Sequence, residues 1–116
     1  MYNIAVFASG SGSNAENLVN HFKNSQIGKI SVILSNKRDA YVLQRAERLG
    51  VPSVVFSYKE FQDSNVILPI LDKYHIDFIL LAGFLLKVPE YLLEKYPERI
   101  LNIHPALLPN YGGKGM

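Results

Sequence analysis

A glycine-rich segment directly after a short apolar run most constrains what this chain can fold into. Residues 4–8, Ile-Ala-Val-Phe-Ala, form a continuous apolar run, which is typical of a strand buried on both faces of a parallel sheet. The run ends at residues 9–14, Ser-Gly-Ser-Gly-Ser-Asn, and from Asn14 the apolar residues follow one helix face to an expected stop near Gly28. The sequence therefore predicts a strand, a glycine loop and a helix.

The same alternation of strand and helix continues along the chain. Further strands are predicted at residues 30–34, 52–56, 77–82 and 98–104. Further helices are predicted from Asp39 as N-cap to about residue 49, from residue 65 to residue 74, and from Pro89 to about residue 96. Gly50 should end the first of these helices, and Pro69 should kink the second or mark its true start. Residues 58–64 are expected to be a polar connection.

This order of elements predicts an α/β fold, an open and mostly parallel sheet with helices on both faces. Right-handed crossovers favour the Rossmann-like strand order 3-2-1-4-5, in which the first and fourth strands flank the switch point. The glycine loop, Gly83 and the end of the fifth strand would then meet at the carboxyl edge, where such sheets bind ligands. The length of 116 residues fits one domain.

Composition and charge exclude several classes of function. The formal net charge of +2 is spread along the chain, and Lys37 and Arg38 are the only adjacent basic pair, so no nucleic-acid partner is expected. The chain has no cysteine, and its three histidines have no acidic partner at ligand spacing, so no metal site is expected. The first apolar run is too short for a signal peptide or a membrane span. We expect a soluble, cytoplasmic protein without a membrane partner.

The glycine loop is a candidate phosphate site, because its backbone N–H groups and the dipole of the following helix favour an anion there. The loop lacks the third glycine of the dinucleotide fingerprint. The second strand is followed by Asn36, Lys37 and Arg38, where an acidic ribose-binding residue would be needed. A monophosphate is therefore favoured over NAD. The alternative is a tight turn that needs glycine for its geometry alone.

Asn102 and His104 are the candidate catalytic pair. Their spacing of two on a strand points both side chains to the same face, and Pro105 and Pro109 should end the strand close by. The amide could donate a hydrogen bond to an oxyanion, and the imidazole could act as a general acid or base near neutral pH. The alternative is a histidine at a strand end and an asparagine that starts a turn.

Two further groups of residues bear on the site. Residues 85–88, Leu-Leu-Lys-Val, offer either an apolar ligand wall or a connection packed against the core. No acidic residue follows His104, so no carboxylate comes from that segment. The acidic residues at helix starts and strand entrances are predicted to be caps or solvated positions: Glu16, Asp39, Asp63 and Asp77.

These motifs resemble those of the phosphoribosylglycinamide formyltransferases, the folate-dependent glycinamide ribonucleotide transformylases of purine synthesis. The resemblance rests on residues 10–14 (Gly-Ser-Gly-Ser-Asn), 35–37 (Ser-Asn-Lys), 81–84 (Leu-Ala-Gly-Phe) and 101–109 (Leu-Asn-Ile-His-Pro-Ala-Leu-Leu-Pro). The last stretch is shared by formyl-folate transferases as a group. The glycine loop separates this family from the methionyl-tRNA formyltransferases and the formyltetrahydrofolate deformylases.

The resemblance implies transfer of a formyl group from 10-formyltetrahydrofolate, a co-substrate, to the glycyl amine of N1-(5-phospho-D-ribosyl)glycinamide in IMP biosynthesis. It implies no metal. The ribonucleotide, chiefly its phosphate, would be bound by Gly12, Ser13 and Asn14. The formyl-folate would be bound by Leu85, Leu86, Lys87, Val88 and Asn102. The tetrahedral intermediate would be stabilised by Asn102 and His104.

The resemblance also implies a catalytic Asp well downstream of the His-Pro segment, whereas this sequence ends at Met116. We therefore expect residues 1–116 to be the N-terminal nucleotide-binding part of the family's domain, inactive alone and active when extended. A non-catalytic module that binds a phosphate or nucleotide is one alternative. Another formyl-folate enzyme, of the deformylase type, is the second.

Overall fold

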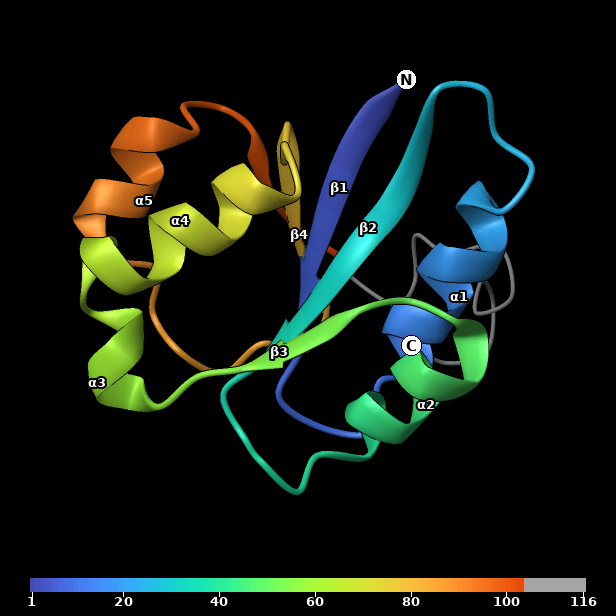
Figure 1. The fold of residues 1–116 in the computed structure, drawn as a ribbon, viewed down its shortest axis with the longest axis horizontal. Coiled ribbons are helices and arrows are strands. Elements are labelled where there is room, and N and C mark those ends of the chain that lie inside the picture. The colour runs from blue at the N-terminus through green and yellow to red at the C-terminus, as the bar shows by residue number, and fades with distance from the viewer. Residues whose placement is uncertain (104–116) are drawn as a thin grey trace.

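The computed structural model describes residues 1–103, and five strands in this part form one parallel sheet (Figure 1). The strands are β1 (Tyr2–Phe7), β2 (Gly28–Ser35), β3 (Ser53–Val55), β4 (Phe78–Leu81) and β5 (Ile100–Asn102). Their order across the sheet is β3-β2-β1-β4-β5, and every adjacent pair is parallel. The predicted order 3-2-1-4-5 is therefore confirmed, with β1 at the centre.

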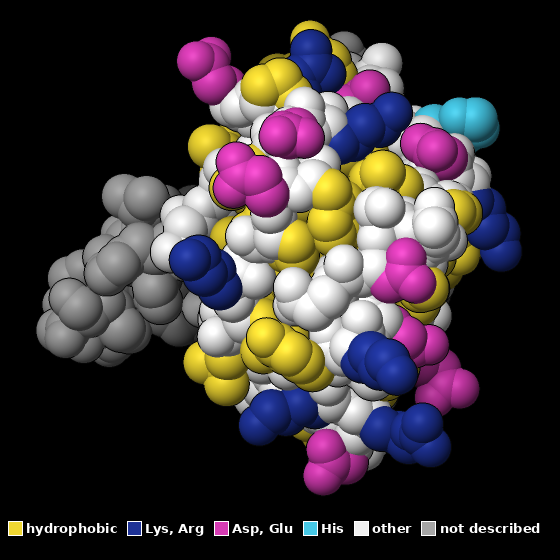
Figure 2. Space-filling model, turned by 90° about the vertical axis from the view of Figure 1, so that its left-hand side faces the viewer, with side chains coloured by type: hydrophobic (Ala, Val, Ile, Leu, Met, Phe, Trp, Pro, Cys, Tyr) yellow, Lys and Arg dark blue, Asp and Glu magenta, His cyan; other side chains and the backbone are white. Residues whose placement is uncertain are grey.

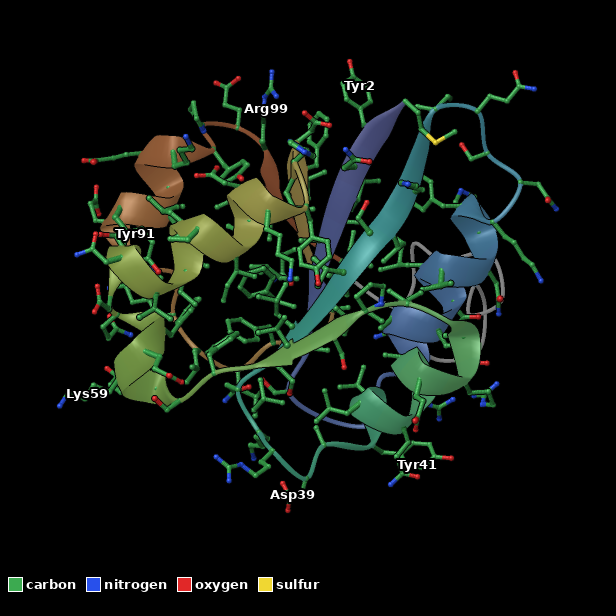
Figure 3. All side chains as sticks on the ribbon, in the orientation of Figure 1. Tyr2, Asp39, Tyr41, Lys59, Tyr91 and Arg99 are labelled. Carbon is green, nitrogen blue, oxygen red and sulfur yellow. The ribbon has the colours of Figure 1, made fainter. Side chains whose placement is uncertain are left out.

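Helices cover both faces of the sheet, as predicted. They are α1 (Ser13–Phe22), α2 (Tyr41–Leu49), α3 (Tyr58–Phe61), α4 (Ser64–Lys73) and α5 (Glu90–Lys95). Figure 1 shows α1 and α2 on one side of the sheet and α3, α4 and α5 on the other. Tyr91 on α5 donates its hydroxyl to the backbone oxygen of Phe61 at 2.7 Å, which joins α5 to α3 (Figure 3).

The central strand contributes to two separate apolar cores. Ile4 and Val6 pack in the core beneath α1 and α2, whereas Ala5 and Phe7 pack in the core beneath α3, α4 and α5. Because successive strand residues point to opposite faces, both faces of β1 must be apolar. This explains why the segment appears in the sequence as a continuous apolar run.

The predicted polar connection at residues 58–64 is wrong, because α3 forms within it. Ser57 accepts a hydrogen bond from the backbone N–H of Glu60, and the Glu60 carboxylate accepts one from the N–H of Ser57, which is a capping box. Phe61 is fully buried at the end of the helix. A helix of four residues has no measurable period, so only its cap could have predicted it.

Two helix starts differ from the prediction. Asp39 is not an N-cap, because α2 starts after Ala40, which makes no side-chain cap bond. Figure 3 shows Asp39 at the outer end of the turn between β2 and α2. The helix α4 starts at Ser64 behind the N-cap Asp63, whose carboxylate accepts from the N–H of Asn65 at 2.9 Å. Pro69 therefore lies inside α4 and does not mark its start.

The predicted end of the first helix lies too late in the chain, and the predicted start of the fifth strand lies too early. The helix α1 ends at Phe22, and Gly28 is the first residue of β2 rather than a helix stop. The strand β5 starts at Ile100 instead of residue 98, because Glu98 has a φ of 60°, a left-handed conformation that no strand residue adopts. The expected end of α2 at Gly50, with φ 74°, is confirmed.

Candidate functional site

The carboxyl ends of three neighbouring strands are aligned. Phe7 of β1 pairs with Leu81 of β4, and Leu81 pairs with Asn102 of β5. The N–H of Ile103 donates to the Leu81 oxygen at 2.9 Å, so the alignment continues past the last strand residue. Asn102 is exposed and lies roughly 10 Å, or two strand spacings, from the point where the glycine loop leaves β1. The prediction for His104 falls outside the described residues.

The glycine loop turns directly into α1 at Gly12, the N-cap. Gly12 has φ 81°, and a Cβ built on it would lie 2.3 Å from the Val42 Cγ2 atom, so this position requires glycine. Ser13 is exposed and Asn14 is half-buried. Their N–H groups belong to the first helical turn, which has no acceptor of its own, and Gly12 has no side chain to cap them. The loop therefore combines a geometric need for glycine with donors suited to an anion.

The helix α2 holds the loop from its other side. The oxygen of Gly10 accepts from the N–H of Val42 at 3.2 Å, and the oxygen of Ser11 accepts from the Arg45 Nε at 2.7 Å. These two bonds fix the carbonyl groups of the loop toward α2. Sequence analysis did not identify Arg45, because no local pattern relates it to a loop 34 residues earlier.

Glu16 is neither a cap nor a solvated residue, so that prediction is wrong. Its carboxylate pairs with Arg45 and with Arg48, the latter at 2.7 Å, and the Glu16 side chain is only 20% exposed. Hydrogen bonds from Arg48 and then Arg45 hold the pKa of the Glu16 carboxyl below its ordinary value. Glu16 therefore joins α1 to α2 beside the loop and is not available as a base.

The segment that follows β4 is anchored by an aromatic ring. Gly83 has φ 70° and turns the chain, and Phe84 then packs edge-on against Phe7 and Phe61 at centroid distances of 5.4 and 5.3 Å. Such edge-to-face pairs are the favoured aromatic geometry. Phe84 therefore fixes the start of residues 85–88 to the core beneath α3.

The sequence left open whether residues 85–88 form a ligand wall or a connection packed against the core, and in the structure the four side chains divide between these two roles. Leu86 and Val88 are half-buried and pack against the core on the α3–α5 side. Leu85 is 72% exposed, and Lys87 is exposed. Only Leu85 and Lys87 are thus free to contact a ligand with most of their side chains.

On the α3–α5 face, described basic and acidic side chains are interspersed, and no basic stripe crosses it (Figure 2). Asp77 accepts from the N–H of Asn3 at 2.8 Å, at the amino end of the sheet. Within residues 1–103, no group of three His, Asp or Glu side chains could hold a metal ion. Every helix in that part is too short or too polar to cross a bilayer.

Comparisons with known proteins identify the family of this chain. The family model described as formyl transferase matches residues 2–116. A chloroplastic phosphoribosylglycinamide formyltransferase of Arabidopsis thaliana is 40% identical, over 97% of this chain and 41% of that protein. The phosphoribosylglycinamide formyltransferase of Haemophilus influenzae is 36% identical, over 97% of this chain and 56% of that protein.

Solved structures give the same result. The glycinamide ribonucleotide transformylase 1 of Geobacillus kaustophilus is 38% identical with a TM-score of 0.82, covering 99% of this chain and 64% of that chain. The phosphoribosylglycinamide formyltransferase of Streptococcus pneumoniae is 42% identical with a TM-score of 0.78, over 94% of this chain and 59% of that chain. The chain spans about half the length of the curated relatives it matches. Since the family model covers almost the whole sequence, the chain belongs to the formyl transferase family.

Proposed function

We propose that the chain is the N-terminal, nucleotide-binding part of a phosphoribosylglycinamide formyltransferase. Such an enzyme transfers the formyl group of 10-formyltetrahydrofolate to the glycyl amine of N1-(5-phospho-D-ribosyl)glycinamide. The observation that supports this most is the alignment of the β1, β4 and β5 ends, because it brings the glycine loop, residues 83–88 and Asn102 to one edge. Membership of the formyl transferase family supports formyl-folate as the co-substrate.

The two substrates would occupy different parts of this edge. The N–H groups at the start of α1 suit the phosphate of the ribonucleotide, held by Gly12, Ser13 and Asn14. The exposed Leu85 side chain suits an apolar ring, and Lys87 suits an acidic group. Leu86 and Val88 would support that contact from the core side.

The proposed reaction is an attack of the glycyl nitrogen on the formyl carbon. A C–N bond to the amine forms, the bond from the formyl carbon to the folate nitrogen breaks, and the proton lost by the amine is balanced by a proton gained by that folate nitrogen. The exposed amide of Asn102 would donate a hydrogen bond to the formyl oxygen as negative charge develops on it. His104 would act with it as a proton donor or acceptor.

The test uses the polypeptide encoded by the whole reading frame, glycinamide ribonucleotide and 10-formyltetrahydrofolate. Asn102→Ala should lower kcat roughly 100- to 1,000-fold, which is the usual cost of removing one oxyanion donor. Asn24→Ala is the matched control, because Asn24 is an exposed residue in the connection between α1 and β2. Activity of Asn102→Ala equal to that of the control would refute the catalytic assignment.

The same assay separates the alternative functions. Formylated ribonucleotide as the product supports the proposal. Formate released without the amine acceptor would instead indicate a deformylase, and binding of the phosphate ligand without turnover would indicate a non-catalytic module. A cytoplasmic location stays a prediction, since the Arabidopsis relative is a chloroplastic protein.

A further inference from the structure

Two serines in the described part of the chain, Ser9 and Ser35, are buried, and their hydroxyl groups are used differently. Among the residues that the structure describes, the Ser35 hydroxyl bonds only to the backbone of Lys37, two residues away. The Ser9 hydroxyl donates to the Asn36 Oδ1 at 2.6 Å and accepts from the N–H of Leu85 at 2.9 Å. Ser9 therefore joins segments that lie 27 and 76 residues away in the sequence.

Ser9 also makes a backbone bond to the same turn. Its N–H donates to the oxygen of Gly83 at 3.2 Å, while its hydroxyl holds the N–H of Leu85. The two bonds attach Ser9 to Gly83 and to Leu85, the residues before and after Phe84. Since Ser9 follows β1, Asn36 follows β2 and Gly83 follows β4, the contact connects the ends of three neighbouring strands at the switch point.

The hydroxyl bond matters most for Leu85. Phe84 is held by aromatic packing, and Leu86 by the core, but the Leu85 side chain is 72% exposed and is not fixed by packing. The bond from the Leu85 N–H to Ser9 holds the backbone at the point where this side chain leaves it. Its loss would leave a partly buried donor unpaired and the exposed residue free to turn.

We propose that Ser9 is a positioning residue for the formyl-folate, acting through Leu85 and not by touching the reacting atoms. This inference rests on the proposed function, in which Leu85 contacts the folate ring. The next two residues of the glycine loop have other partners, because Val42 and Arg45 of α2 hold the carbonyl groups of Gly10 and Ser11. Loss of the Ser9 hydroxyl should therefore weaken the folate contact and spare the ribonucleotide contact.

The test is the steady-state kinetics of Ser9→Ala in the polypeptide of the whole reading frame. The KM for 10-formyltetrahydrofolate should rise about 10-fold, as expected when a buried donor loses its partner. The KM for glycinamide ribonucleotide and kcat should stay within about 2-fold, since neither depends on Leu85 in this arrangement. Calorimetric titration with tetrahydrofolate, which lacks the formyl group, should show the same loss of affinity without any chemical step.

Ser35→Ala is the matched control, because it removes a buried serine hydroxyl whose partners are local. An equal rise of both KM values in Ser9→Ala, or kinetics identical to those of Ser35→Ala, would overturn the inference. If Ser9→Ala does not fold, Asn36→Ala replaces it, since Asn36 is half-buried and accepts from the Ser9 hydroxyl. A selective rise in the folate KM of that variant supports the inference, and unchanged kinetics refute it. Absence of formyl transfer by the unsubstituted protein would instead refute the proposed function itself.

Discussion

Replacing Gly12 by alanine tests whether the glycine loop is fixed by its backbone conformation and by its contact with α2 together. A new Cβ would lie 2.3 Å from the Val42 Cγ2 atom and 2.8 Å from the Val42 Cα atom. The second contact is with backbone, so turning the Val42 side chain cannot relieve it. The φ of 81° adds a second energetic penalty, because residues that carry a side chain rarely adopt this backbone conformation.

Two other glycines separate these penalties. Gly50 has φ 74° but an open space where its Cβ would lie, so Gly50→Ala should cost only the backbone term, about 1 kcal/mol. Gly10 has neither a positive φ nor a neighbour within 4 Å, so Gly10→Ala should stay within about 1 kcal/mol of the unsubstituted chain. Gly12→Ala adds an overpacking cost of about 1–3 kcal/mol to the backbone term of about 1 kcal/mol, for a total of roughly 2–4 kcal/mol.

The measurement is urea unfolding of the three variants, followed by far-ultraviolet circular dichroism. The free energy of unfolding should fall in the order Gly10→Ala, Gly50→Ala, Gly12→Ala. Phosphate or ribonucleotide binding should be lost in Gly12→Ala alone, because only this substitution displaces the start of α1. A Gly12→Ala variant as stable as Gly50→Ala would show that the close approach to Val42 does not constrain the loop, and would refute the reasoning.

Two pH-dependent effects follow from side chains outside the proposed substrate contacts. The pKa of Glu16 is lowered by Arg48 and Arg45, so its ionised form stabilises the fold above its ordinary pKa of 4.5, and this contribution is lost as the pH falls through the lower folded-state pKa. Glu16→Gln should accordingly reduce the free energy of unfolding at pH 7 and lose that difference in acid, and a pH-independent difference would contradict the ion pair. Burial raises the pKa of Tyr91 to about 12, so its contribution is complete below pH 10 and is lost as the pH rises through 12. The chain has seven tyrosines and no tryptophan, so absorbance at 295 nm reports tyrosinate, and Tyr91→Phe should remove one late-titrating group. Loss of an early-titrating group instead would contradict the burial of Tyr91.

The order of the strands could be predicted from the sequence because it depends on local patterns. The continuous apolar run at residues 4–8 indicates by its sequence alone that both faces of the strand are buried. The alternation of strands with helices then allows only a few sheet topologies. The errors occur where the local signal is weak or shared. Asp39 and Asp63 are equally good N-caps by residue type, yet only Asp63 accepts a bond from the first turn of its helix.

The edge that carries the candidate site could also be predicted, because the carboxyl ends of parallel strands share one edge. The side-chain contacts that support this edge could not be predicted. The contacts of Glu16 with Arg45 and Arg48 span 29 and 32 residues, and no sequence spacing marks them. The division of residues 85–88 into two inward and two outward side chains depends on the position of the core beneath α3, which becomes known only once Phe84 has a place to pack.

The two halves of the edge have partly different supports, and Ser9, the first residue of the glycine-rich segment, joins them. The glycine loop is held by polar contacts from α2, through the N–H of Val42 and the guanidinium of Arg45. The segment after β4 is held by Phe84 in an aromatic core and by the Ser9 hydroxyl. A transfer reaction needs both substrates at fixed positions, because a displacement of about 1 Å can cost 100-fold in rate. In the proposed arrangement, each substrate position would have supports of its own besides the shared Ser9, and Asn102 would be aligned with both through the backbone pairing of β1, β4 and β5.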